Sequence, residues 1–134
     1  MNNQNVAKEI LILQEACFCY AREIIRSQQA LVPFAAFLNA KSEIIIEDKI
    51  LHPPINKNRI EYLSDKFKRL SYIQKVKVWV ICFDGIIEKN EFINQEAICI
   101  EIHEVNKNLI RNIYYPYESS RNKITFRKPL SEIK

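Results

Sequence analysis

The alternation of hydrophobic and polar residues predicts a long amphipathic helix over residues 5–29. Apolar residues recur there at steps of three and four, which places them on one side of a helix. A second apolar row borders the first and widens the apolar surface to about half of the circumference. The first row comprises Val6, Ile10, Leu13, Cys17, Ala21 and Ile24, and the second comprises Leu11, Phe18 and Ile25. We expect a helix with so broad an apolar surface to cover a sheet and to contact a second surface as well.

Other periodicities predict the rest of the secondary structure. Short β-branched and aromatic runs on either side of a polar turn predict a hairpin. A 3-4-3 spacing of apolar residues then predicts a second amphipathic helix, and alternating apolar and polar residues predict strands in the remainder. The expected elements are a hairpin at 34–46, a helix over 58–71, and strands at 76–83, 95–105, 109–115 and 124–126.

This order predicts an α+β fold with one mainly antiparallel sheet and two helices packed on one face. The order of elements, α-β-β-α-β-β-β with a further short strand, resembles the layout of the roadblock, profilin and longin folds. We expect residues 1–134 to form a single domain, with residues 1–4 and 131–134 frayed at its ends.

The composition of the chain limits the kinds of ligand and metal site that it can form. The chain of 134 residues has a single glycine, Gly85, so the glycine-rich loops that cradle phosphates are excluded. Its four cysteines contain no C-x-x-C pair, and Cys17 and Cys19 point to different sides of a helix. We therefore expect free thiols, no metal site and no cofactor. The chain has neither an apolar run of membrane-spanning length nor a secretory signal pattern, which predicts a cytoplasmic protein without a membrane partner.

Charge suggests one candidate function. The net charge is +4, and two basic segments flank an acidic segment. A basic surface that uses residues 57–77 and 107–134 would bind nucleic acid through its phosphates. The candidate residues are Lys66, Lys68, Arg69, Arg121, Lys123, Arg127 and Lys128.

A second candidate function is catalysis at a polar site on the strand at 95–105. Glu101 and His103 share one face of that strand, and a histidine beside a carboxylate can act as a general base. Arg111 and Tyr115 belong to the following strand and complete the candidate set. The sequence places no nucleophile beside them, so we expect a non-catalytic protein.

Three short motifs give a resemblance to a family. They are Pro33-Phe34-Ala35 at the start of the hairpin, Ala97-Ile98-Cys99-Ile100 in a strand, and Pro116-Tyr117 near the end. With the leading helix, these motifs make the chain similar to an uncharacterised family of small bacterial α+β proteins. The chain departs from that pattern in two places, because its hairpin turn lacks Asp-Gly and its Glu-His pair is reversed as His103-Glu104. The resemblance implies a fold and no activity.

The expectation favoured by the pattern is a binding or assembly module that self-associates or binds another protein. A broad apolar helix surface and a strand that is apolar on both sides leave more apolar surface than one small domain should hide. The candidate contact residues are Leu11, Phe18, Ile25, Trp79, Ile81 and Phe83.

Overall fold

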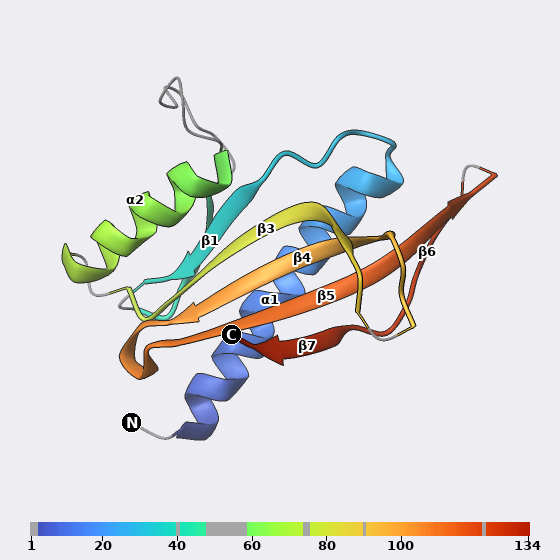
Figure 1. The fold of residues 1–134 in the computed structure, drawn as a ribbon. Helices are drawn as coiled ribbons and strands as arrows, with labels where there is room; N and C mark the ends of the chain where they lie inside the picture. Colours follow the sequence, from blue (N-terminus) through green and yellow to red (C-terminus); the bar gives the residue numbers. More distant parts are fainter. Residues whose placement is uncertain (1–2, 40, 48–58, 74–75, 90, 122) are drawn as a thin grey trace.

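The computed structural model describes residues 3–39, 41–47, 59–73, 76–89, 91–121 and 123–134 (Figure 1). The side chains of residues 3–6, 59, 70–73 and 106 are not described. The elements are α1 (Asn3–Arg26), β1 (Phe34–Leu38), β2 (Ile44–Glu47), α2 (Arg59–Ile73), β3 (Val78–Ile87), β4 (Gln95–Glu104), a 3-10 turn (Val105–Lys107), β5 (Leu109–Ser120), β6 (Lys123–Phe126) and β7 (Leu130–Ile133).

The strands form one antiparallel sheet in the order β2-β1-β3-β4-β5-β6, and β7 also pairs with β5. The α+β class, the antiparallel sheet and the order of the elements are therefore confirmed. None of the helices in the described residues is long and apolar enough to span a membrane.

Helix α1 covers one face of this sheet, and Figure 1 shows it running behind β3, β4 and β5. Leu13, Cys17 and Ala21 are fully buried against it, and each large apolar side chain buried in this way contributes about 1.5–3 kcal/mol. The strand residues of this core include Ala36 and Leu38 of β1, Val78, Val80 and Cys82 of β3, Ile98, Ile100 and Ile102 of β4, and Ile113 and Tyr115 of β5.

Helix α2 packs against the other set of alternate strand positions. Leu63 and Phe67 of α2 are fully buried against Ala35 of β1 and against Trp79 and Ile81 of β3. Because successive strand residues point to opposite faces, α2 lies on the face of β1 and β3 that α1 does not cover. This placement differs from the single shared face expected from the sequence. Its physical reason is that β3 is apolar at every position from 78 to 83, so both of its faces need a cover.

The C-terminal end also differs from the expectation of fraying. Residues 130–133 form β7, which pairs with residues 111–114 of β5. The backbone N–H of Lys134 donates to the carbonyl oxygen of Ile110 at 2.9 Å. At the other end of the chain Asn3 already belongs to α1, and residues 1–2 lie outside the described residues.

Strand β3 continues through the single glycine of the chain. Gly85 pairs with Ala97 inside the β3–β4 ladder, although the strand predicted from the sequence ended at residue 83. A Cβ atom at this position would lie 3.0 Å from the sulfur of Cys99 and 3.4 Å from the ring of Phe83. A larger residue at this position would therefore require the Cys99 side chain to shift by a few tenths of an ångström.

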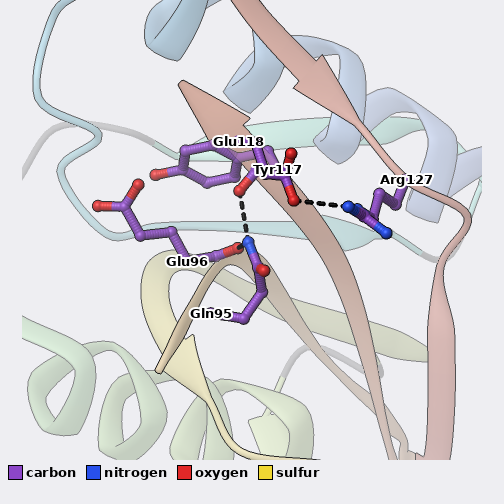
Figure 2. A network of polar contacts seen from close by, with 5 residues as sticks. All are labelled: Gln95, Glu96, Tyr117, Glu118 and Arg127. Atoms are coloured by element: carbon purple, nitrogen blue, oxygen red, sulfur yellow. Dashed lines mark hydrogen bonds and ion pairs between the residues drawn. The ribbon is translucent and has the colours of Figure 1, made fainter. Parts of the chain in front are cut away.

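A polar network joins the ends of β4, β5 and β6 (Figure 2). The Gln95 side-chain amide donates to the carbonyl oxygen of Tyr117 at 2.6 Å and to that of Glu96 at 3.1 Å. The guanidinium of Arg127 donates to the Glu118 carboxylate at 2.6 Å. These contacts tie the β5–β6 hairpin to the neighbouring strand.

Candidate functional site

The sequence-predicted pair Glu101 and His103 is brought together on β4. Residues i and i+2 of a strand share a face, and Nε2 of His103 lies 2.6 Å from Oε1 of Glu101. The carboxylate can only accept, so Nε2–H is the donor. This hydrogen bond is the largest cause of a lowered pKa for Glu101, since it favours the ionised carboxylate.

Trp79 fixes the plane of the histidine ring. Strand register places Trp79 directly opposite His103, and the two rings stack with centroids 3.6 Å apart and an interplanar angle of 6°. His103 is only 8% exposed. The imidazole is thus held by a carboxylate at one nitrogen and by an indole across its face.

Arg111 and Tyr115 do not join this pair. Arg111 is paired with Ile102 and Tyr115 with Ile98, so both point to the α1 face. The phenol oxygen of Tyr115 accepts from the Gln14 side chain at 2.9 Å, and its ring stacks on Phe18 at 3.9 Å. The four-residue catalytic set predicted from the sequence is wrong, because β5 meets β4 in a register that turns both residues away.

Other polar residues stand beside Glu101 instead. Register puts Asn112 of β5 opposite Glu101, and Glu132 of β7 opposite Asn112. The Glu132 carboxylate accepts from Lys89 and from the hydroxyl of Tyr114, each at 2.7 Å. The Lys89 hydrogen bond is the largest cause of its lowered pKa. The sequence reasoning missed this cluster because it expected no strand at the C-terminus, and Leu130–Ile133 (LSEI) has no apolar–polar alternation that would have predicted one.

A hollow of about 390 Å³ opens beside His103 at the end of β4 nearest α2. It has apolar walls, the stacked Trp79–His103 pair and a lysine from α2. Its lining residues are Lys68, Trp79, His103, Glu104, Val105, Asn108, Leu109 and Ile110.

The thiols provide no ready nucleophile next to the histidine. Burial raises the pKa of Cys17 and of Cys99 to about 12, and burial also raises the pKa of Cys82. Cys19 is the exposed cysteine, and it lies on α1. Within the described part of the chain, no three His, Cys, Asp or Glu side chains are grouped so that they could hold a metal ion.

Most of the apolar residues proposed as a partner surface are buried within this one chain. Phe18 and Ile25 face the sheet, and Trp79 and Ile81 lie under α2. Phe83 is half-buried against Ile87, Ala97 and Cys99 and the side chains around them. Of the six, Leu11 is the one that is largely exposed, at 54%. The expectation that the whole helix stripe exceeds its sheet is therefore corrected.

A groove lies between α1 and β7, and Leu11 is one helical turn away from the α1 residue that lines it. The groove encloses about 530 Å³ and is lined by Gln14, Arg111, Ile113, Pro129, Leu130, Ser131, Glu132 and Ile133. Leu11 precedes Gln14 by three residues, so it flanks the groove on the same side of the helix. Ile133 is 66% exposed on the opposite bank. Ile12, which follows Leu11, is also exposed.

The two groups of basic residues lie at different ends of the sheet. Lys66, Lys68 and Arg69 belong to α2, which packs on β1 and β3, whereas the other four lie in and around the β5–β6 hairpin at the far end (Figure 1). Lys66 forms an ion pair with Glu47, and Arg127 pairs with Glu118. The seven residues predicted for nucleic acid therefore form no single surface.

Comparison of the chain with protein-family models, with curated proteins and with solved structures gave no match.

Proposed function

We propose that this protein is a non-catalytic assembly module that binds a second copy of itself through the groove between α1 and β7. The observation that carries the proposal is this groove, with the exposed Ile133 in its lining and the exposed Leu11 three residues before the lining residue Gln14 on α1. Apolar side chains that gather at one surface commonly mark a protein interface. Most other apolar residues of α1 are buried against the sheet of the same chain. Leu11 and its neighbour Ile12 are the large apolar residues that stay exposed among the described side chains of α1.

The unpaired edge of β7 is the reason to expect a second copy of this chain, and not another protein, at the groove. Strand β7 pairs with β5 on one side, and among the described residues no strand pairs with its other side. A free strand edge presents alternating N–H and C=O groups, which an identical antiparallel strand satisfies about a two-fold axis. Such pairing would bring the apolar borders of two grooves together.

The test is the molar mass in solution, measured by light scattering and by sedimentation over micromolar concentrations. We expect a dimer, and we expect Leu11→Glu and Ile133→Glu each to shift it to monomer. A charge at either position would be buried without a partner in the interface.

Two matched controls come from exposed isoleucines elsewhere. Ile86 and Ile93 are 68% and 79% exposed and do not line the groove, so Ile86→Glu and Ile93→Glu should leave the dimer intact. A wild-type chain that stays monomeric, or a dimer that dissociates equally in all four variants, would overturn the proposal. A chain that is monomeric and binds a different protein at this groove would show that the groove takes that protein and not a second copy.

A further inference from the structure

The hollow beside His103 has the size and the lining of a small-molecule site. Its volume of about 390 Å³ lies within the range of ligand pockets, which combine apolar walls with a few placed polar groups. Val105, Leu109 and Ile110 supply apolar wall, while His103 and Asn108 supply polar groups. The groove between α1 and β7 is lined by other residues, so the hollow is a separate feature.

The second ring nitrogen of His103 is a hydrogen-bond acceptor. Because Nε2–H donates to Glu101, Nδ1 of the neutral imidazole carries a lone pair and no proton. Among the described residues, no group donates to Nδ1, although His103 is only 8% exposed. The stack on Trp79 holds the ring in its plane. This acceptor is therefore preorganised for a hydrogen-bond donor that enters the hollow.

Asn108 brings a complementary donor to the lining. It follows the 3-10 turn in the left-handed conformation, and its backbone N–H donates to the carbonyl oxygen of Val105 at 3.3 Å. Its side chain is exposed and makes no hydrogen bond with the described residues. The NH₂ of an asparagine can donate to an oxygen whose own proton is given to a neighbouring acceptor. An acceptor and a donor in one lining match a hydroxyl group.

The charged groups at the hollow already have partners in the protein. The carboxylate of Glu104 lies 3.8 Å from the ammonium of Lys107 and 3.9 Å from the guanidinium of Arg111. Lys68 also has a partner within the fold, and Glu101 is hydrogen-bonded to His103. A charged ligand would find no unpaired counter-charge here, which favours a neutral one.

We propose that this hollow binds a small neutral alcohol with an apolar body. The hydroxyl donates to Nδ1 of His103 and accepts from the side-chain amide of Asn108, and the apolar body lies along Val105, Leu109 and Ile110. Binding at this site does not depend on self-association, so either proposal can fail without the other.

The protein carries its own reporter for the test, because Trp79 is the single tryptophan of the chain and lines the hollow. We would titrate the full chain with 1-hexanol and follow the tryptophan fluorescence. The control ligand is 1-methoxypentane, an isomer of hexanol that has the same oxygen but no donor. Hexanol should give a saturable change, and the ether should bind at least about threefold more weakly.

A charged analogue tests the neutrality of the site. Hexylamine is protonated at neutral pH and can donate to Nδ1, but its charge would have no free partner in the hollow. It should bind more weakly than hexanol. Tighter binding of hexylamine would overturn the proposal of a neutral ligand.

Two asparagines with the same backbone conformation provide a variant and its control. Asn108 and Asn94 have φ angles of 50° and 48°, which glycine adopts without strain, and both side chains are exposed. Asn108→Gly should weaken hexanol binding at least about threefold. Asn94→Gly should leave it unchanged, because Asn94 does not line the hollow.

A third variant tests the acceptor itself. His103→Phe keeps an aromatic ring beside Trp79 and removes Nδ1, so the variant should bind hexanol and the ether equally. Asn108→Gly and its control leave the buried pair untouched, and they decide the question even where His103→Phe fails to fold. The absence of a saturable signal, equal affinity of the wild type for the ether, or equal losses in the two asparagine variants would overturn the proposal.

Discussion

The two faces of the sheet are covered in different ways. On one face α1, with 24 residues, spans about 36 Å and lies over an apolar core that extends from β1 to β5. On the other face α2, with 15 residues, spans about 22 Å and covers mainly β1 and β3. The remainder of that second face carries Glu101, Asn112 and Glu132 in one row across β4, β5 and β7.

This difference in cover shows which parts of the sheet remain accessible for a binding site. The α1 face is filled by a continuous apolar core that serves stability, and it opens at the groove between α1 and β7. The α2 face ends at the edge of a short helix, where the buried pair Trp79–His103 meets a hollow. The Glu101 and Glu132 carboxylates on this face each have a hydrogen-bond partner, as partly buried polar groups require.

The largest effect is expected when one buried leucine is truncated in the core on one face of the sheet at a time. Leu13 of α1 and Leu63 of α2 are both fully buried, and Leu→Ala at such positions lowers the free energy of unfolding by about 2–5 kcal/mol. We expect Leu13→Ala and Leu63→Ala both to fall in this range, measured by denaturant unfolding.

The spectroscopic signatures of these two variants should separate the faces. Leu63→Ala should change the fluorescence of Trp79, because the two residues share a core, while Leu13→Ala should leave the native emission unchanged. If Leu13→Ala alters the emission as strongly, the two faces do not behave as separate cores.

An intermediate effect is expected at Glu101. The lowered pKa of Glu101 in the folded state means that ionisation stabilises the fold at neutral pH, and that this stability is lost as the pH falls through the folded-state pKa, which lies below the ordinary value of a glutamate. Glu101→Gln should therefore lower the free energy of unfolding by about 1–2 kcal/mol at pH 7, and the variant and the wild type should converge in acid.

Glu118 provides the control for this prediction. It pairs with Arg127 at the surface, where both side chains are more than half exposed, so Glu118→Gln should cost less than about 1 kcal/mol. Chemical denaturation of the three proteins across the acid range checks both expectations. A Glu101→Gln variant with the pH profile of the wild type would show that the His103 contact contributes nothing to stability.

The smallest perturbation is the reaction of the four thiols with a disulfide reagent at mildly alkaline pH. Cys19 is exposed and should react first, while burial raises the pKa of Cys17, Cys82 and Cys99 and keeps them protonated. Cys99, on the less covered face, should follow, and Cys17 and Cys82 should react only on unfolding. Cys19→Ser should abolish the fast phase, and simultaneous reaction of all four thiols would contradict the filled core on the α1 face.

Local periodicity was sufficient for much of the fold. The predicted helix over 5–29 corresponds to α1 (Asn3–Arg26), and the hairpin, the second helix and four later strands were also placed correctly, although β3 and β5 end four and five residues later than predicted. The prediction succeeded there because amphipathic spacing is a property of each segment alone. The close position of Glu101 and His103 was also readable, since both lie on the same strand.

Contacts between distant segments were decided by tertiary structure alone. The register of β4 and β5 separates Arg111 and Tyr115 from His103, and the docking of α2 buries Trp79 and Ile81. The short strand β7 forms because its backbone pairs with β5. Its four residues by themselves do not predict a strand. The amino-acid sequence thus determined which side chains share a helix side or a strand face, because that follows from backbone geometry. Which faces meet depends on the free energy of packing the whole chain, which no single segment contains.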